Sequence, residues 1–206
     1  MRDKQVKFWL ILFFIVYVSE SVAGYSAQDF FVASKLEDIS AEEAISKKEK
    51  EHIINTEFAI TKDSSSPFAV MSNEPYRLEL RSVDIHLYPV ENGGYVISVT
   101  SILGNHGQSQ YISFYQISED GHIVQSLDFK DVGLTQVLSN EFLDEKQYFS
   151  DSNNFPVNLY INEDGSIDAS PWTWMSPEWE FREIVNQIKF VWTGKQFTKE
   201  VTSVVK

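Results

Sequence analysis

Histidine and cysteine, the residues that most often hold zinc, are scarce in this chain. Its four histidines lie far apart in the sequence, and it contains no cysteine. No two imidazoles have the four-residue spacing that places them on one helical face, and no thiolate can assist them. The sequence therefore predicts no metal site and no cofactor. The histidines are His52, His86, His106 and His122.

The stretch from Asn162 to Asp168 resembles part of a calcium-binding loop. Alignment of Gly165 with the glycine of such a loop places Tyr160 and Pro171 at the first and last ligand positions, where acidic groups are needed. A hairpin turn explains the same residues, and a weak calcium site near Asp164 stays an open alternative.

Nucleophilic catalysis has no recognisable signature. There is no Gly-x-Ser-x-Gly motif, and the Ser-x-x-Lys spacing from Ser203 to Lys206 falls at the end of the chain, where we expect no enclosing pocket. Carboxylates beside aromatic residues could form a glycosidase-like pair, but they are abundant throughout this acidic chain. The enzyme question stays open, and the sequence favours a protein without catalytic activity. These carboxylates are Asp168, Glu178, Glu180 and Glu183.

Three of the five tryptophans occur within eight residues, in a segment that also contains Pro171 and Pro177. One interpretation is a packed flap over one end of a β core. The other is a protein interface, because tryptophan supplies a large rigid contact area and is common at binding hot spots. Acidic neighbours would then form a rim that faces a basic partner. The predicted partner-binding residues are Trp172, Trp174, Trp179, Glu178, Glu180 and Glu183.

Most of the chain alternates between apolar and polar residues, which is typical of strands. The apolar set of residues 76–80 shifts phase before residues 83–87, which predicts one long strand with a bulge near Ser82. His86 lies between Ile85 and Leu87 in this strand, so we expect it to be partly exposed. Four dipeptides predict hairpin turns between antiparallel neighbours. They are Asn92-Gly93, Asp120-Gly121, Asp164-Gly165 and Thr193-Gly194.

Near the N-terminus, Ser40 and Glu43 form a potential capping box that predicts a helix from about Ala41 to Ile54. Residues 24–39 should form an ordered lead-in or a short helix. The predicted fold is mainly β: an antiparallel β-sandwich or partly open β-barrel with one N-terminal helix, α+β by a strict count. Residues 24–206 should form a single domain, with residues 24–67 as lead-in and helix and residues 68–206 as the antiparallel β core.

The first 23 residues have the layout of a secretory signal peptide. Arg2, Lys4 and Lys7 precede an apolar run, and small residues lead to a cleavage site near Ala23. We therefore expect a periplasmic or secreted protein with no stable membrane anchor after cleavage. Loss of residues 1–23 removes three basic and two acidic residues, so the formal charge changes from −13 to −14. Nucleic acid would be repelled by this charge.

Taken together, these features favour an exported, non-enzymatic protein-binding domain. Its acidic and aromatic face would capture a partner protein that has a basic surface. An inhibitor or a toxin-immunity factor would act in this way. Two other hypotheses stay open. One is a cell-envelope carbohydrate-binding module or glycan hydrolase that uses the tryptophans to stack on sugars, and the other is a structural or assembly component of the envelope.

Overall fold

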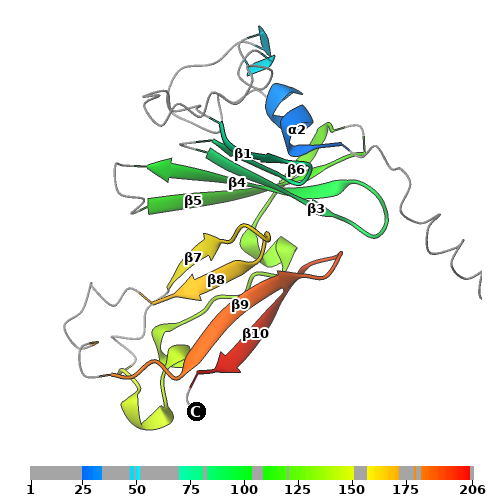
Figure 1. The fold of residues 1–206 in the computed structure, drawn as a ribbon. Helices are drawn as coiled ribbons and strands as arrows, with labels where there is room; N and C mark the ends of the chain where they lie inside the picture. Colours follow the sequence, from blue (N-terminus) through cyan, green and yellow to red (C-terminus); the bar gives the residue numbers. More distant parts are fainter. Residues whose placement is uncertain are drawn as a thin grey trace, which may run out of the picture.

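The computed structural model describes residues 25–33, 47, 48, 50, 51, 70–80, 83–103, 109–119, 121–150, 157–171, 179 and 182–204. The fold of this part is mainly β, as the sequence predicts: two stacked antiparallel sheets with one short helix on the outer face of the larger sheet (Figure 1). The predicted signal peptide lies outside the described residues. No helix within them is long and apolar enough to cross a membrane.

The larger sheet is built from six strands, each antiparallel to the next, in the order β1-β2-β3-β4-β5-β6. Because the order in the sheet follows the order in the chain, β1 and β6 are its two edges. The strands are β1 (Val70–Glu74), β2 (Arg77–Leu80), β3 (Val83–Pro89), β4 (Tyr95–Leu103), β5 (Ser109–Ile117) and β6 (Ile123–Leu127).

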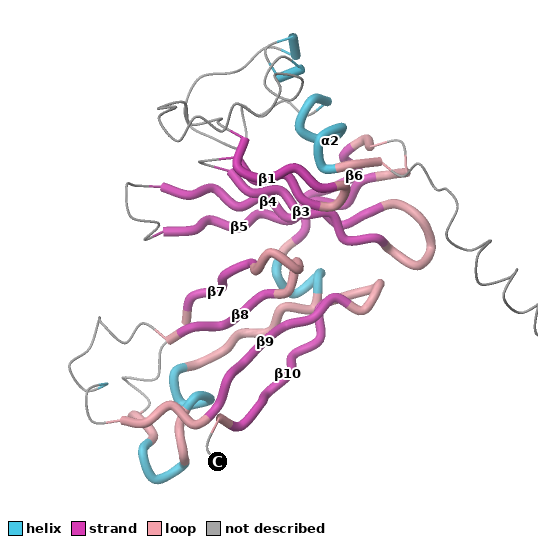
Figure 2. Tube along the Cα trace, viewed as in Figure 1, coloured by secondary structure: helices cyan, strands magenta, loops and turns pink. Residues whose placement is uncertain are grey.

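The smaller sheet has four strands in the order β10-β9-β8-β7, so that β7 and β10 are its edges. Residues 128–150 lead from the larger sheet toward it as loops with three short 3-10 turns (Figure 2). The strands are β7 (Asn158–Ile161), β8 (Ile167–Ser170), β9 (Asn186–Trp192) and β10 (Phe197–Ser203). The turns are η2 (Phe129–Val132), η3 (Ser139–Phe142) and η4 (Glu145–Gln147).

All four predicted hairpin turns are confirmed, and each contains a glycine with a positive φ angle. The β5–β6 and β7–β8 turns have the same geometry. The amide of Gly121 donates to the carbonyl of Ser118 at 2.9 Å, and the amide of Gly165 donates to that of Asn162 at 2.9 Å. Similar sequences thus give the same local turn in the two sheets.

The prediction of one long bulged strand from residue 76 to 87 is wrong. Strands β2 and β3 are separate and pair antiparallel, with Leu78 opposite Ile85 and Glu79 opposite Asp84. Cross-strand partners share a face of the sheet, so Leu78 and Ile85 are buried on the same side although the apolar phase changes between them. The phase change near Ser82 therefore marks a reversal of the chain.

Helix α2 (Ala27–Ala33) covers one face of the larger sheet through Phe30 and Phe31, which are fully buried. The hydroxyl of Ser26 accepts a hydrogen bond from the amide of Asp29, and the carboxylate of Asp29 accepts one from the amide of Ser26. This reciprocal capping fixes the start of the helix. Of the helix predicted over residues 41–54, the described residues 47, 48, 50 and 51 are helical, and Ser40 and Glu43 lie outside.

A second core lies between the two sheets. Tyr88 on β3 contacts Phe197 at a centroid distance of 5.0 Å and Trp192 at 5.5 Å. The indole Nε1 of Trp192 also donates to the carbonyl of Pro89 at 2.8 Å. The β7–β8 turn lies against the same face, because an ideal Cβ on Gly165 would be 3.1 Å from Cε1 of Tyr88. The larger sheet is therefore packed on both sides.

Replacement of Gly165 by alanine should disturb this packing. The φ angle of Gly165 is +76°, and its new methyl group would press on the buried Tyr88. Gly194 has a similar φ angle of +88°, but its methyl group would meet Cγ of Glu91, a half-exposed side chain. We expect Gly165→Ala to lower the free energy of unfolding by about 1–3 kcal/mol more than Gly194→Ala does. Urea unfolding measures both, and equal losses would contradict the packing of this turn.

Candidate functional site

Four of the predicted partner-binding residues, Trp172, Trp174, Glu178 and Glu180, lie outside the described residues. Their role stays a prediction. The other two differ in their surroundings. Glu183 is exposed, while the ring of Trp179 is only 4% exposed.

Trp179 packs into the hydrophobic cluster that also contains Phe142 and Phe149 rather than lying open on a surface. Its ring meets Phe149 edge-on with a centroid distance of 4.9 Å, and the guanidinium of Arg182 lies 3.9 Å from the centroid of the same phenyl ring. Arg182 also donates from Nε to the carbonyl of Gln147 at 2.8 Å. This arrangement ties Trp179 and Arg182 to the loop beside η4, so Trp179 contributes core packing in this structure.

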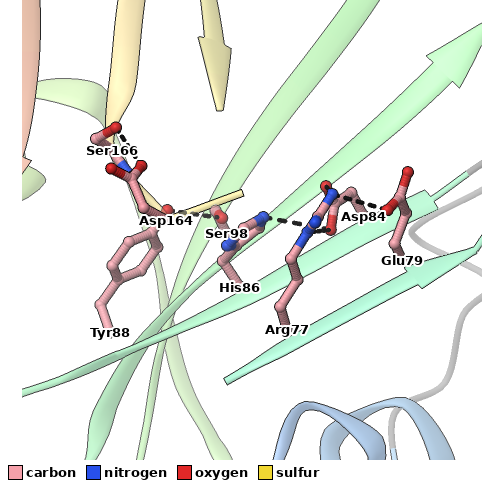
Figure 3. A network of polar contacts seen from close by, with 8 residues as sticks. All are labelled: Arg77, Glu79, Asp84, His86, Tyr88, Ser98, Asp164 and Ser166. Atoms are coloured by element: carbon pink, nitrogen blue, oxygen red, sulfur yellow. Dashed lines mark hydrogen bonds and ion pairs between the residues drawn. The ribbon is translucent and has the colours of Figure 1, made fainter. Parts of the chain in front are cut away.

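A buried polar network on β2 and β3 is the feature that most resembles a catalytic centre (Figure 3). Nη2 of Arg77 donates to Glu79 at 2.8 Å and to Asp84 at 3.2 Å. Nε2 of His86 lies 3.3 Å from Oδ1 of Asp84, outside the alignment of a good hydrogen bond. Asp84 thus lies between a guanidinium and an imidazole on the face of β3 that looks toward the smaller sheet.

The network continues along β3 and onto β4. The ring of Tyr88 stacks on His86 at 6.3 Å, and the hydroxyl of Ser98 donates to that of Tyr88 at 3.4 Å. Burial of Tyr88 raises its pKa above the ordinary value, so the phenol stays protonated. His86 is 3% exposed, and the expectation of a partly exposed histidine is wrong. The smaller sheet covers the face on which His86 lies, which sequence alternation alone does not reveal.

Electrostatics keep Asp84 ionised despite its burial. Burial by itself would raise the pKa of Asp84, but the neighbouring His86 and Arg77 outweigh it and lower the pKa below the ordinary value. A carboxylate, an imidazole and the hydroxyl of Ser98 on adjacent strands resemble an acid–base relay. Ser98 is fully buried, however, and the β7–β8 turn covers His86, so no substrate can reach these groups in this conformation. We conclude that the network is a covered part of the larger sheet at its interface with the smaller one.

The described residues also form an open groove of about 530 Å³ between β5, the segment that contains η2, and β7. Its walls contain six apolar and six polar residues, and four of the polar ones are exposed. The apolar residues are Ile112, Phe129, Leu134, Val137, Val157 and Leu159, and the polar residues include Asp128, Lys130, Thr135, Gln136, Asn158 and Tyr160.

The groove follows the free edge of β7. Asn158, Leu159 and Tyr160 all line it, although successive side chains of a strand point to opposite faces. A hollow lined by residues of both faces must run along the strand edge. Strand β7 pairs with β8 on its other side, and the described residues form no strand on this one. The groove therefore combines unpaired backbone with an apolar wall.

Charges around the groove lie mainly at its mouth. Asp128 and Lys130 form an exposed ion pair at 3.7 Å, so they nearly cancel one another. The chain between Asp131 and Glu183 contains 11 acidic residues and only two basic ones, Lys146 and Arg182. The net charge of −13 would therefore attract a basic ligand to the molecule as a whole. Among the residues that the structure describes, no group of three or more histidine, aspartate or glutamate side chains is arranged to hold a metal ion.

Sequence reasoning missed this groove. It did place strands on both sides of Asp164-Gly165, but it contained no signal that β7 is a sheet edge. Nor did it indicate that Leu134 and Val137 lie beside β7, because these residues are more than 20 positions away from it in the chain.

Comparisons with known proteins support the fold alone. The sequence matches no protein family and no curated protein. The structure is similar to that of a domain of an uncharacterized protein from Porphyromonas gingivalis W83, with a TM-score of 0.52 and 14% sequence identity. The match covers 87% of this chain and 99% of that one.

Stability should depend on the ionised state of Asp84. Because its folded-state pKa is lowered, its stabilising contribution is complete above the unfolded-state pKa of about 4 and is lost as the pH falls through the folded-state pKa. We expect Asp84→Asn to reduce the free energy of unfolding by about 1–3 kcal/mol at pH 7, and the difference from wild type to shrink below about pH 4. Chemical unfolding over this pH range measures it. Glu200→Gln on the exposed face of β10 serves as the control, and an equal pH response of both variants would contradict the role of Asp84.

Proposed function

We propose that the protein is an exported, non-enzymatic protein-binding domain that captures a basic partner in the manner of an inhibitor or toxin-immunity factor. The observation that carries this proposal is the groove along β7, where apolar side chains and unpaired strand backbone lie open together. Protein partners use such edges through backbone hydrogen bonds and side-chain pockets. Periplasmic or secreted location is part of the same proposal and rests on residues 1–23.

Two further observations favour binding over catalysis. The network around Asp84 and His86 contains the chemistry of an acid–base site but lies under the β7–β8 turn. The groove is accessible, but its lining consists mostly of aliphatic, aromatic and amide side chains with one ion pair at the mouth. A groove with such a lining is suited to bind a ligand. The acidic excess would steer a basic partner toward it and make association sensitive to salt.

Partner binding should weaken when a substitution introduces a positive charge into the groove. Thr135 is exposed on its rim, and Thr198 is exposed on β10, outside the groove lining. We expect Thr135→Arg to weaken partner binding at least tenfold, because the guanidinium occupies the groove and repels a basic ligand, while Thr198→Arg binds as wild type does. The partner is identified by affinity capture from a cell-envelope extract at low salt and mass spectrometry, and its affinity is then measured by calorimetry with purified proteins.

Three outcomes would contradict the proposal. The first is that no protein is captured at low salt. The second is that Thr135→Arg and Thr198→Arg bind the purified partner equally well. The third is that the wild-type protein binds or cleaves cell-wall glycan instead, which would favour the carbohydrate hypothesis. Thermal unfolding of both variants should match wild type within a few degrees, since both sites are exposed.

A further inference from the structure

We propose that β7 receives an extended segment of the partner protein as an added strand, paired with the backbone of Leu159 and Ile161. This inference rests on the proposed protein-binding function and specifies its mode. The occupant is a segment in which every second side chain is apolar and basic residues lie at the ends. It extends the smaller sheet from four strands to five.

The β7–β8 turn decides which backbone groups of β7 are available. The amide of Asn162 donates to the carbonyl of Ser166 at 2.8 Å, so these two residues form a hydrogen-bonded pair. Such pairs alternate along an antiparallel ladder, which makes Tyr160 the next residue bonded to β8. The amides and carbonyls of Leu159 and Ile161 therefore point away from β8. They form no backbone hydrogen bond to any other described residue.

Strand β7 also lacks the features that usually prevent edge pairing. Its four residues contain no charge and no proline, and its register with β8 has no bulge. The opposite edge strand of the same sheet, β10, contains Lys199 and Glu200. Charged side chains on an edge discourage the approach of another strand, and an uncharged edge permits it. This contrast favours β7 over β10 as the edge to which a strand can be added.

The groove predicts the side-chain pattern of the added strand. Side chains on the core face of that strand would enter the space lined by Ile112, Leu134 and Val137, which requires apolar residues at alternate positions. The residues between them would lie on the outer face, beside Tyr160. Four residues of β7 cover about 13 Å at about 3.3 Å each, so a segment of about four residues fills the edge. Basic ends match the net charge of −13 of the whole chain.

A phage-displayed library of random ten-residue peptides, panned at low salt against the full purified chain, tests the occupant. We expect the enriched peptides to contain apolar residues at every second position with lysine or arginine at the ends. Two variants then test the pairing with the best synthetic peptide. Leu159→Pro removes the outward amide without touching the bonds to β8, and Leu159→Ala loses the side chain but keeps that amide. By fluorescence polarisation, Leu159→Pro should bind at least tenfold more weakly than Leu159→Ala.

Amide hydrogen exchange of the wild-type protein gives a second readout that needs no variant. Addition of the peptide should slow exchange of the amides of Leu159 and Ile161 at least tenfold. The amide of Tyr160, already bonded to β8, should change little. This residue-by-residue alternation is specific to strand addition.

Several results would overturn strand addition: no enriched peptide, apolar residues spaced three or four apart as in a helix, equal binding by Leu159→Pro and Leu159→Ala, or no alternation in exchange. If Leu159→Pro fails to fold, the exchange measurement decides. A dimer in analytical ultracentrifugation that Leu159→Pro abolishes would replace the foreign partner by a second copy of this chain. In all these cases, loss of the captured partner in Thr135→Arg would leave the proposed function standing.

Discussion

The structure depends on the burial of β3 on both faces. Its odd-numbered residues, such as Ile85, pack under helix α2, while Asp84, His86 and Tyr88 face the smaller sheet. Apolar packing alone accounts for the burial of the face of β3 that lies under helix α2. The second side requires that buried polar groups satisfy one another, because a charge without a partner in the interior is costly. Arg77 supplies the partner for Asp84 and so permits the second sheet to stack here.

That stacking also sets the position of β7. The β7–β8 turn rests on Tyr88 and His86 through Gly165, where a side chain would not fit without a shift of the tyrosine. Strand β7 is thus held against the larger sheet at its turn, and its edge is left along the groove beside Leu134. A rigid edge loses little conformational entropy when a partner strand adds to it, which favours recognition at this place.

The chain contains both the groups of an acid–base relay and an accessible groove. The tertiary structure buries the relay groups and leaves the groove open. The relay groups are covered and lie at the interface between the sheets. The accessible groove is lined mainly by apolar, aromatic and amide side chains along the edge of β7. Trp179, expected in the binding surface, instead packs on Phe149. A tryptophan-rich segment can therefore contribute to the core with one ring, whatever its other rings do.

The sequence by itself determined what depends on neighbouring residues. Each Asn-Gly, Asp-Gly or Thr-Gly turn acts over four or five residues, so the hairpins and the antiparallel, mainly β class could be predicted. The sequence did not determine whether residues 76–87 form one bulged strand or two antiparallel strands, because a bulge and a chain reversal give the same phase change. The burial of His86 and the open edge of β7 were decided by tertiary structure alone. Both depend on which sheet covers which face, and that choice is made by contacts between residues such as Tyr88 and Phe197, more than 100 positions apart.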